Sequence, residues 1–185
     1  MKKIISIIVP LYNEEEIVKN TVIQLNEVAS HWNEDFEIIF VNDGSLDKTY
    51  QILKEIAKNN KKIKIINFSR NFGHQMAFTA GIDFAKGDAV IVIDGDLQDP
   101  PEIMTKFIKK WKEGYQVVYG KRLQRKGENY FKLISAKLFY RFMATLSDIS
   151  IPKDTGDFRL MDKIVIKKLI SMREKHRFIR GMVSW

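Results

Sequence analysis

Residues 88–102 read Asp-Ala-Val-Ile-Val-Ile-Asp-Gly-Asp-Leu-Gln-Asp-Pro-Pro-Glu, an apolar run followed by a polar turn and a pair of prolines. An apolar run of this length, almost free of polar residues, is typical of a strand that other elements cover on both faces. The proline pair favours the start of a helix, because proline is well tolerated in the first helical turn. Strands buried on both faces occur in parallel sheets flanked by helices, so this stretch predicts an α/β fold.

The same alternation of apolar runs and amphipathic segments extends outward from residues 88–102. The first helix is expected to begin with a capping box of Asn13 and Glu16, and the second to be capped by Ser45 or Asp47. Regular strand–helix alternation predicts a mostly parallel, Rossmann-like sheet with helices on both faces. Strands are expected at 4–9, 36–41, 63–68, 88–93 and 116–119, with helices between them, the third over 76–85 and the fourth over 100–112.

Length and composition indicate one ordinary globular domain. The chain has 185 residues, of which 45% are hydrophobic and 29% charged, and this size is enough for one substantial core. It has no cysteine, which excludes disulfides and thiolate metal sites. The apolar run at 4–9 ends at Pro10 without a signal-peptide cleavage site, and no stretch approaches the roughly 20 apolar residues of a transmembrane helix.

The net charge of +8 is unevenly distributed along the chain. Residues 1–102 carry 11 Lys/Arg and 16 Asp/Glu, whereas residues 103–185 carry 20 and 7. The acidic part suits a bound cation, and the basic part suits an anionic partner such as phosphate, anionic lipid or nucleic acid. A lysine-rich solvated surface is the alternative explanation of the basic part.

Within the basic part, residues 129–146 place apolar side chains at a spacing of three to four residues, flanked by Lys132, Lys137 and Arg141. A basic amphipathic helix of this kind lies in a membrane interface, which makes an anionic membrane surface an expected partner. The alternative is a helix packed on the sheet, as most apolar stripes are.

Asp94 and Asp96 follow the buried strand, two residues apart, in a turn that Gly95 makes tight. Carboxylates at this spacing can share one hard divalent cation, directly or through water. Mg²⁺ or Mn²⁺ bound there would keep coordination positions for diphosphate oxygens and neutralise a leaving group. The alternative is an Asp-Gly turn with a helix cap.

Polar residues also follow the other predicted strands, at the edge of an open α/β sheet where ligands bind. Tyr12 could stack on a base, and Glu14 and Asp43 could accept hydrogen bonds from a ribose or base. Arg70 could face phosphates or hold the neighbouring carboxylates. Asp43 also fits turn chemistry, and Glu14 also fits the capping box of the first helix. P-loop, dinucleotide-binding and nucleophile-elbow motifs are absent, and the three histidines, His31, His74 and His176, are expected to be surface or structural residues.

Five ordered motifs extend over almost the whole chain and resemble those of family 2 glycosyltransferases. The likeness is strongest to the polyprenyl-phosphate branch, which includes dolichyl-phosphate mannose synthases and bacterial undecaprenyl-phosphate glucosyltransferases. The motifs are Ile-Ile-Val-Pro-Leu-Tyr-Asn-Glu at 7–14, Val-Asn-Asp-Gly-Ser-x-Asp at 41–47, Arg-Asn-Phe-Gly at 70–73, Asp-Gly-Asp-Leu-Gln-Asp-Pro-Pro-Glu at 94–102, and Thr-Gly-Asp-Phe-Arg-Leu-Met-Asp at 155–162 with the later Arg-Phe-Ile-Arg-Gly-x-x-x-Trp at 177–185.

This resemblance implies a GT-A fold and transfer of a sugar from a UDP- or GDP-sugar to a polyprenyl phosphate. It implies that Pro10, Tyr12, Glu14 and Asp43 contact the nucleoside of the donor, that Asp94, Asp96 and Gln98 hold the metal, and that Asp157 lies near the acceptor. Arg70 and Asp94 complete the candidate donor-binding residues. Two features depart from the family. Asn42 stands where a further Asp is frequent, a difference expected to affect nucleotide preference. The family's chains continue past the final motif into transmembrane helices, so residues 1–185 are expected to be a truncated catalytic domain that works at the cytoplasmic face of a membrane.

The leading hypothesis is an inverting hexosyltransferase that uses UDP-glucose or a similar donor, Mg²⁺ or Mn²⁺, and a polyprenyl phosphate. Asp94, Asp96 and Asp157 are its candidate catalytic residues, and Arg122, Arg125 and Arg159 are candidates for the acceptor phosphate. One alternative is a transferase of the same fold with a hydroxyl acceptor, in which Asp157 is the general base. A nucleic-acid-binding module is the other, less favoured because it leaves the acidic strand ends unexplained. A homo-oligomer is left open.

Overall fold

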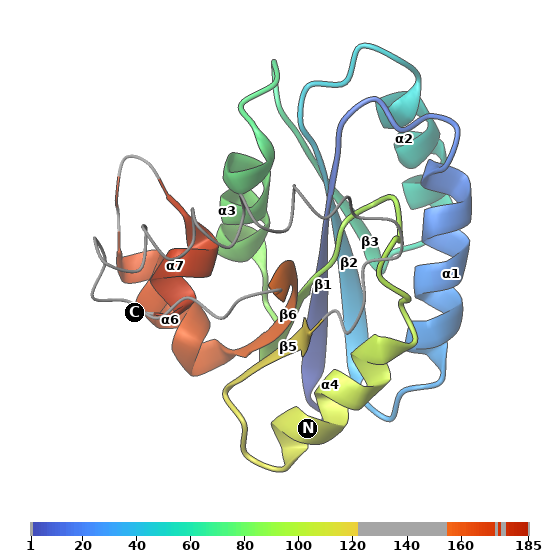
Figure 1. Cartoon of the computed structure of the whole chain (residues 1–185). Helices are drawn as coiled ribbons and strands as arrows, with labels where there is room; N and C mark the ends of the chain where they lie inside the picture. Colours follow the sequence, from blue (N-terminus) through green and yellow to red (C-terminus); the bar gives the residue numbers. More distant parts are fainter. Residues whose placement is uncertain (1, 122–154, 173, 175–176, 185) are drawn as a thin grey trace, which may run out of the picture.

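The computed structural model describes residues 2–121, 155–172, 174 and 177–184 (Figure 1). The strands are β1 (Ile4–Leu11), β2 (Asp35–Asn42), β3 (Ile63–Asn67), β4 (Ala89–Val92), β5 (Val117–Lys121) and β6 (Thr155–Asp162). The helices are α1 (Val18–Ser30), α2 (Thr49–Asn59), α3 (His74–Phe84), α4 (Ile103–Lys112), α6 (Lys163–Ser171) and α7 (Ile179–Ser184). Every strand and helix predicted from residues 1–121 is present.

These strands form one sheet in the order β3-β2-β1-β4-β6-β5. β1 pairs in parallel with β2 and β4, and β2 with β3, so the predicted parallel core of the sheet is confirmed. β6 was not predicted as a strand, yet it lies between β4 and β5 and is antiparallel to both. This antiparallel strand brings the 155–162 motif back to the edge of β4, directly beside the Asp94 turn.

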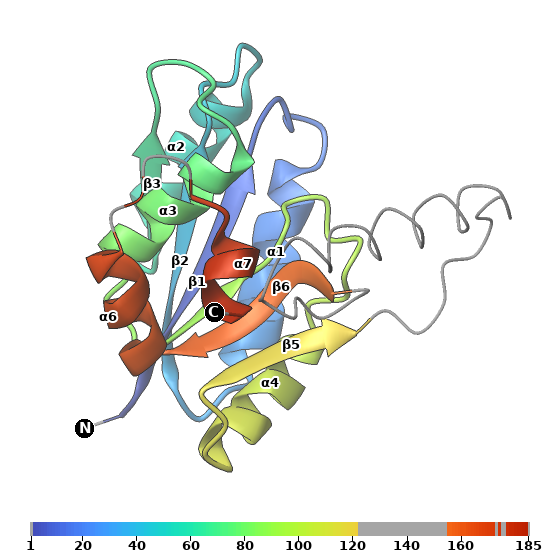
Figure 2. The same ribbon diagram turned by 60° about the vertical axis from the view of Figure 1, so that its left-hand side comes forward.

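Helices cover both faces of the sheet, as predicted. One face packs against α1, α2 and α4, and the other against α3, α6 and α7. Neighbouring β1 residues divide between the two cores: Ile7 faces the first and Ile8 the second, and both are fully buried. Figure 1 shows α3, α6 and α7 on one side of β1 and α1 and α2 on the other. In Figure 2, α3 and α6 lie to the left of β1 and α1 lies to its right.

The capping box predicted for the first helix is wrong. α1 begins at Val18, with Ile17 at the N-cap position and no side-chain cap. Asn13 instead adopts a left-handed backbone conformation, with φ of 55°, and its side chain accepts a hydrogen bond from the backbone of Leu46. For the second helix, the Asp47 carboxylate accepts from the backbone N of Thr49, although the N-cap position itself is Lys48.

Within the described part of the chain, no helix is long and apolar enough to cross a membrane. The predicted interfacial helix at 129–146 lies outside the described residues.

Candidate active site

A pocket of about 440 Å³ lies at the carboxyl ends of β1, β2 and β4, a volume usual for small-molecule sites. Six of the residues proposed from the sequence line it. They come from three separate strand ends and meet because parallel strands deliver their carboxyl ends to one edge. The proposed residues in the lining are Pro10, Tyr12, Glu14, Asp43, Asp94 and Asp96, and the other lining residues are Leu11, Asn71, Gly73, His74, Ala77 and Gly95.

Two of the residues proposed for the donor or the metal do not line this pocket, and neither do Asp157 and Arg159, proposed for the acceptor. Arg70 is exposed, and its guanidinium carbon lies 4.8 Å from the centre of the Phe72 ring. Gln98 is also exposed, and its backbone N donates to Asp96 Oδ1 at 3.2 Å. Arg122 and Arg125 lie outside the described residues. Asn42 is buried and does not line the pocket, so any influence on the nucleotide is indirect.

The Asp94 side chain has an unusual environment. Its Oδ1 atom is buried and makes no hydrogen bond to any described group, although His74 Nε2 lies 3.1 Å away, within ion-pair distance. Apart from His74, no described group is placed to donate to this buried oxygen, so a lone pair is left for a cation, and oxygen is the ligand that Mg²⁺ and Mn²⁺ prefer. The described residues contain no cluster of three or more His, Cys, Asp or Glu side chains that could hold a metal ion by themselves. Asp94 and Asp96 therefore fit a cation that water and substrate oxygens complete.

His74 is the residue that the sequence argument missed. It is the first residue of α3, and its ring packs edge-to-face on the buried Phe78 at 4.3 Å between centroids. Its Nε2 lies 3.1 Å from Asp94 Oδ1 and 3.9 Å from Asp157 Oδ2. The interaction with Asp94 raises the pKa of His74, against the opposing effect of burial. Its place just after the Arg70–Gly73 motif, at the carboxyl end of β3, is the signal that could have identified it.

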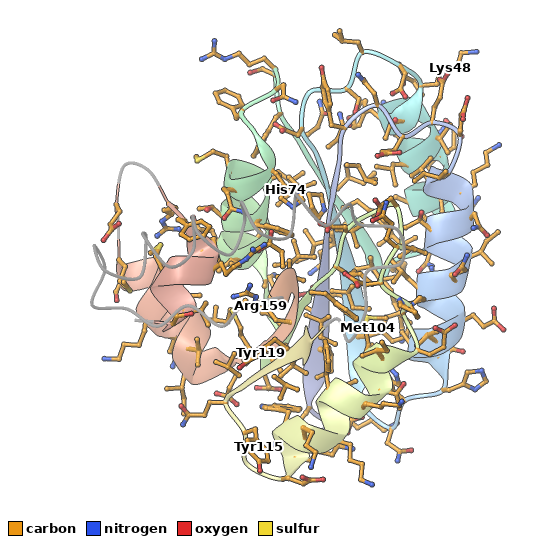
Figure 3. The ribbon with its side chains drawn as sticks, in the orientation of Figure 1. Lys48, His74, Met104, Tyr115, Tyr119 and Arg159 are labelled. Carbon is orange, nitrogen blue, oxygen red and sulfur yellow. The ribbon has the colours of Figure 1, made fainter. Side chains whose placement is uncertain are left out.

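Asp157 is surrounded by cationic groups from three elements. Its carboxylate lies 3.3 Å from Arg180 on α7, 3.5 Å from Arg159 on β6, and 3.9 Å from His74. Figure 3 labels His74 at the start of α3 and Arg159 on β6. The Arg180 Nε atom is buried and has no hydrogen-bond partner among the described residues. Asp157, proposed to lie near the acceptor, is thus within reach of the Asp94 turn.

Arg159, proposed to hold the acceptor phosphate, is only 5% exposed. Its guanidinium donates to the carbonyl oxygens of Gly156 and Asp157 at 3.0 and 3.2 Å. Burial lowers its pKa, while the neighbouring Asp157 acts in the opposite direction. Arg159 therefore stabilises the start of β6, which presents Asp157. Arg180, beside Asp157, has a donor, Nε, without a hydrogen-bond partner among the described residues.

Asp43 and Glu14 also line the pocket. Asp43 is 3% exposed and accepts hydrogen bonds from the backbone N of Phe72 at 2.7 Å and of Gly73 at 2.9 Å. It therefore fixes the loop that leads into His74 as well as lining the pocket. Burial, followed by the charges of Asp96 and Asp47, raises the pKa of Glu14.

Comparison with known proteins identifies the family. The model of glycosyl transferase family 2 matches residues 6–170. The chain belongs to this family. It is 53% identical over 180 residues to the uncharacterized glycosyltransferase YkcC of Bacillus subtilis, covering 97% of this chain and 56% of that protein. It is 39% identical over 184 residues to the prophage bactoprenol glucosyl transferase homolog of Escherichia coli K12, covering 98% and 59%. The chain thus spans little more than half the length of these relatives.

Solved glycosyltransferases share the fold. The mannosyltransferase PcManGT of Pyrobaculum calidifontis, solved in complex with GDP-Man and Mn²⁺, superposes with a TM-score of 0.63 at 17% identity, over 91% of this chain and 46% of that one. S. aureus TarS in complex with UDP-GlcNAc gives a TM-score of 0.61 at 20% identity, over 91% and 47%. At these identities the likeness concerns the fold, which is GT-A as expected from the motifs.

Proposed function

We propose that this chain carries the catalytic site of an inverting, metal-dependent hexosyltransferase that transfers a sugar from a nucleotide sugar to a polyprenyl phosphate. UDP-glucose is the proposed donor and undecaprenyl phosphate the proposed acceptor. Family membership supports the reaction class. Similarity to proteins named bactoprenol glucosyl transferase, in Escherichia coli and in Shigella phage SfV, supports the sugar and the acceptor.

One observation carries the proposal: a single pocket joins groups suited to a nucleoside with the Asp94–Asp96 pair. Tyr12 is 42% exposed at its rim and available for stacking on a base. Glu14 and Asp43 supply acceptor oxygens for ribose or base hydroxyl and N–H groups. His74 lies between Asp94 and Asp157, 3.1 and 3.9 Å from their carboxylates. Donor and acceptor would therefore meet beside Asp94.

Asp94 and Asp96 are proposed to hold Mg²⁺ or Mn²⁺, with Gln98 as a further candidate ligand. The bound cation supplies charge neutralisation to the departing diphosphate. The solved Pyrobaculum enzyme of the same fold contains Mn²⁺, which supports this choice of metal.

In the proposed reaction, an acceptor phosphate oxygen forms a bond to the anomeric carbon while the bond from that carbon to the diphosphate oxygen breaks. A phosphate monoester has a second pKa near 6 and is already ionised at neutral pH, so no proton has to be removed. The protein's task is to position both substrates and to stabilise charge on the diphosphate. Arg180 is placed to attract an anionic acceptor, since its guanidinium lies 3.3 Å from Asp157 and its Nε is without a partner among the described groups.

Asp157 separates this proposal from the hydroxyl-acceptor alternative. With two guanidinium groups within 3.5 Å, it is suited to orient cations for a phosphate. Replacing Asp157 by Asn should then lower the rate without changing the shape of the pH–rate profile. If Asp157 is instead a general base, the substitution should remove the acidic limb of that profile.

The first experiment titrates the protein with UDP and GDP by calorimetry, with and without Mn²⁺. We expect UDP to bind more tightly than GDP, and to bind only weakly without the metal.

The second experiment measures transfer from UDP-glucose to a short polyprenyl phosphate or to the matched polyprenol, using this chain and any longer natural form of it. Because the acceptor is a lipid, activity is proposed at the cytoplasmic face of a membrane. Failure to bind either nucleotide, or equal transfer to the polyprenol, would overturn the proposal.

A further inference from the structure

Two loops beside the pocket are joined by hydrogen bonds that neither the fold nor the proposed chemistry requires. The first is the turn after β1, residues 13–15, and the second is the segment before and into α2, residues 45–49. Three consecutive backbone N–H groups of the first loop donate to side chains of the second. Asn13 N donates to Ser45 Oγ at 2.9 Å, Glu14 N to Thr49 Oγ1 at 2.8 Å, and Glu15 N to Asp47 Oδ2 at 3.0 Å.

The bonding is reciprocal. The backbone N of Leu46 donates to Asn13 Oδ1, and that of Lys48 donates to Glu15 Oε2, both at 2.8 Å. These five hydrogen bonds are called the loop clasp below. Each loop supplies backbone donors to side-chain acceptors of the other, so neither can shift by more than a fraction of an ångström without breaking several bonds together.

The loop clasp is anchored in the sheet at Ser45. The Ser45 hydroxyl donates to Asn42 Oδ1 at 2.5 Å, and Asn42 Nδ2 donates to Asn67 Oδ1 at 2.6 Å. Asn42 is 1% exposed and Thr49 is fully buried. The chain of bonds thus runs from the β1 turn through the end of β2 to the end of β3, and the exposed part of the clasp is tied to rigid, buried groups.

Two residues that line the pocket stand on this turn. Tyr12 and Glu14 flank Asn13 on either side and face the pocket, while Asn13 itself has the left-handed φ of 55° that reverses the chain between them. A side chain that contacts a ligand from a loop binds it best when the loop is already in the bound conformation, because no ordering entropy is lost on binding.

We propose that Asn13, Glu15, Ser45 and Asp47 are positioning residues that hold Tyr12 and Glu14 in the conformation that binds the nucleoside of the donor. They act through the loop clasp and do not contact the substrate. This inference rests on the proposed function, because it assumes a nucleotide-sugar donor in the pocket. It gives Asn13, Ser45 and Asp47, which belong to the first two sequence motifs, a role that substrate contact does not give them.

The test compares UDP affinity among single variants by calorimetry with Mn²⁺ present. Asn13→Gly permits the left-handed backbone but removes the acceptor for Leu46, and Ser45→Ala removes the acceptor for Asn13. Each is expected to weaken UDP binding about tenfold, the factor that corresponds to about 1.4 kcal/mol. Asn13→Asp retains the acceptor oxygen and should restore most of the affinity. Glu16→Ala is the matched control, since Glu16 is exposed in the same turn and has no part in the clasp.

Pyrophosphate with Mn²⁺ is the second probe, because it reaches the Asp94 side of the pocket without using the nucleoside side. Its affinity should stay within about twofold of wild type in every clasp variant, and donor KM should rise with little change in kcat, as expected for lost ground-state binding. A general loosening of the fold would weaken both probes and would overturn the inference, as would unchanged UDP affinity in both Asn13→Gly and Ser45→Ala. Failure of the wild-type protein to bind UDP would instead contradict the proposed function.

Discussion

Asp94 and Asp96 differ sharply in environment although one residue separates them. Asp94 carries a buried oxygen beside His74. Asp96 is exposed and, among the described groups, accepts a local hydrogen bond from the Gln98 backbone. An exposed carboxylate with one local hydrogen bond contributes little to folding. Its effect on function can therefore be measured without loss of the fold.

We predict that Asp96→Asn abolishes the gain in UDP affinity that Mn²⁺ provides and lowers kcat/KM about 10²-fold, because one anionic ligand is lost from the cation. Asn retains the acceptor for the Gln98 backbone, so the thermal unfolding midpoint should stay unchanged. Calorimetry and unfolding followed by circular dichroism measure the two effects. Glu16→Gln, which removes a charge from the same edge, is the control. Wild-type metal dependence in Asp96→Asn would refute the metal assignment.

His74 gives a prediction about pH. Because Asp94 raises the pKa of His74 in the folded protein, the folded state holds the proton more tightly than the unfolded chain. The stability from this ion pair is therefore complete below the ordinary histidine value of about 6.5 and is lost as pH rises through the raised pKa. In metal-free protein, His74→Gln should lower the urea midpoint at about pH 6 and leave it unchanged at about pH 9. A difference that grows with pH would contradict this assignment.

At the scale of helices and strands, the local sequence pattern was sufficient to predict an element wherever one signal, an apolar run or a helical periodicity, dominated. The continuous apolar runs of β1, β2 and β4 and the periodic helices α1 to α4 were predictable within a few residues. β6 was missed although Asp157 and Arg159 alternate with Phe158 and Leu160, a period-2 pattern typical of a strand. Its place between β4 and β5 depends on pairing with strands far away in sequence, which the local pattern does not give. The capping box failed for a related reason: Asn13 bonds to the β2–α2 loop in place of its own helix.

The amino end of the sheet contains a buried polar network opposite the pocket. Glu37 is 6% exposed and receives hydrogen bonds from Ser6 Oγ at 2.6 Å, from the backbone N of Lys86 at 2.8 Å, and from Lys64. Burial opposes ionisation, but these hydrogen bonds outweigh it and lower the pKa of Glu37. The network ties β1, β2 and β3 to the segment that precedes β4.

We predict that Glu37→Gln destabilises the protein by about 1–3 kcal/mol, since the amide presents a donor to the Lys64 ammonium and leaves buried groups poorly paired. Because the folded pKa of Glu37 is lowered, its contribution is present above the ordinary value of about 4.3 and is lost as pH falls through the folded pKa. Urea unfolding at several pH values measures both effects. UDP affinity should not change, because the network lies at the opposite end of the sheet; a large loss of affinity would show that this separation is wrong.

For the whole molecule, the topology of a parallel sheet made much of the site predictable. Residues that directly follow strands, such as Tyr12, Asp43 and Asp94, could be gathered at one edge from the sequence alone. Arg180 could not, and for His74 the sequence offered only its place directly after the Arg70–Gly73 motif. The position of His74 in the site depends on where α3 starts. The position of Arg180 depends on the packing of α7 against α3, where Ile179 N donates to Gln75 Oε1 at 3.1 Å across 104 residues of sequence. Tertiary contacts of this kind leave no local pattern.

The charge asymmetry of the chain also belongs to this scale. Residues 103–185 carry 20 Lys/Arg against 7 Asp/Glu, and in the described part they include Lys109, Lys110 and Lys112 in the last turn of α4. A lipid acceptor requires the protein to approach a membrane surface, and a basic surface is attracted to anionic headgroups by about 1 kcal/mol per residue close to them.

We predict weak, reversible binding to vesicles that contain anionic lipid, with little binding to neutral vesicles. The affinity should fall as salt rises, because the Debye length shortens from about 10 Å at 0.1 M to about 3 Å at 1 M. Replacing Phe139 and Phe142 by Ser tests the segment 129–146: binding falls with the fold intact if the rings enter the interface, whereas the protein unfolds if they belong to a core. Flotation measures binding and circular dichroism measures folding. Equal, salt-insensitive binding to both kinds of vesicle would show that charge does not direct this protein to the membrane.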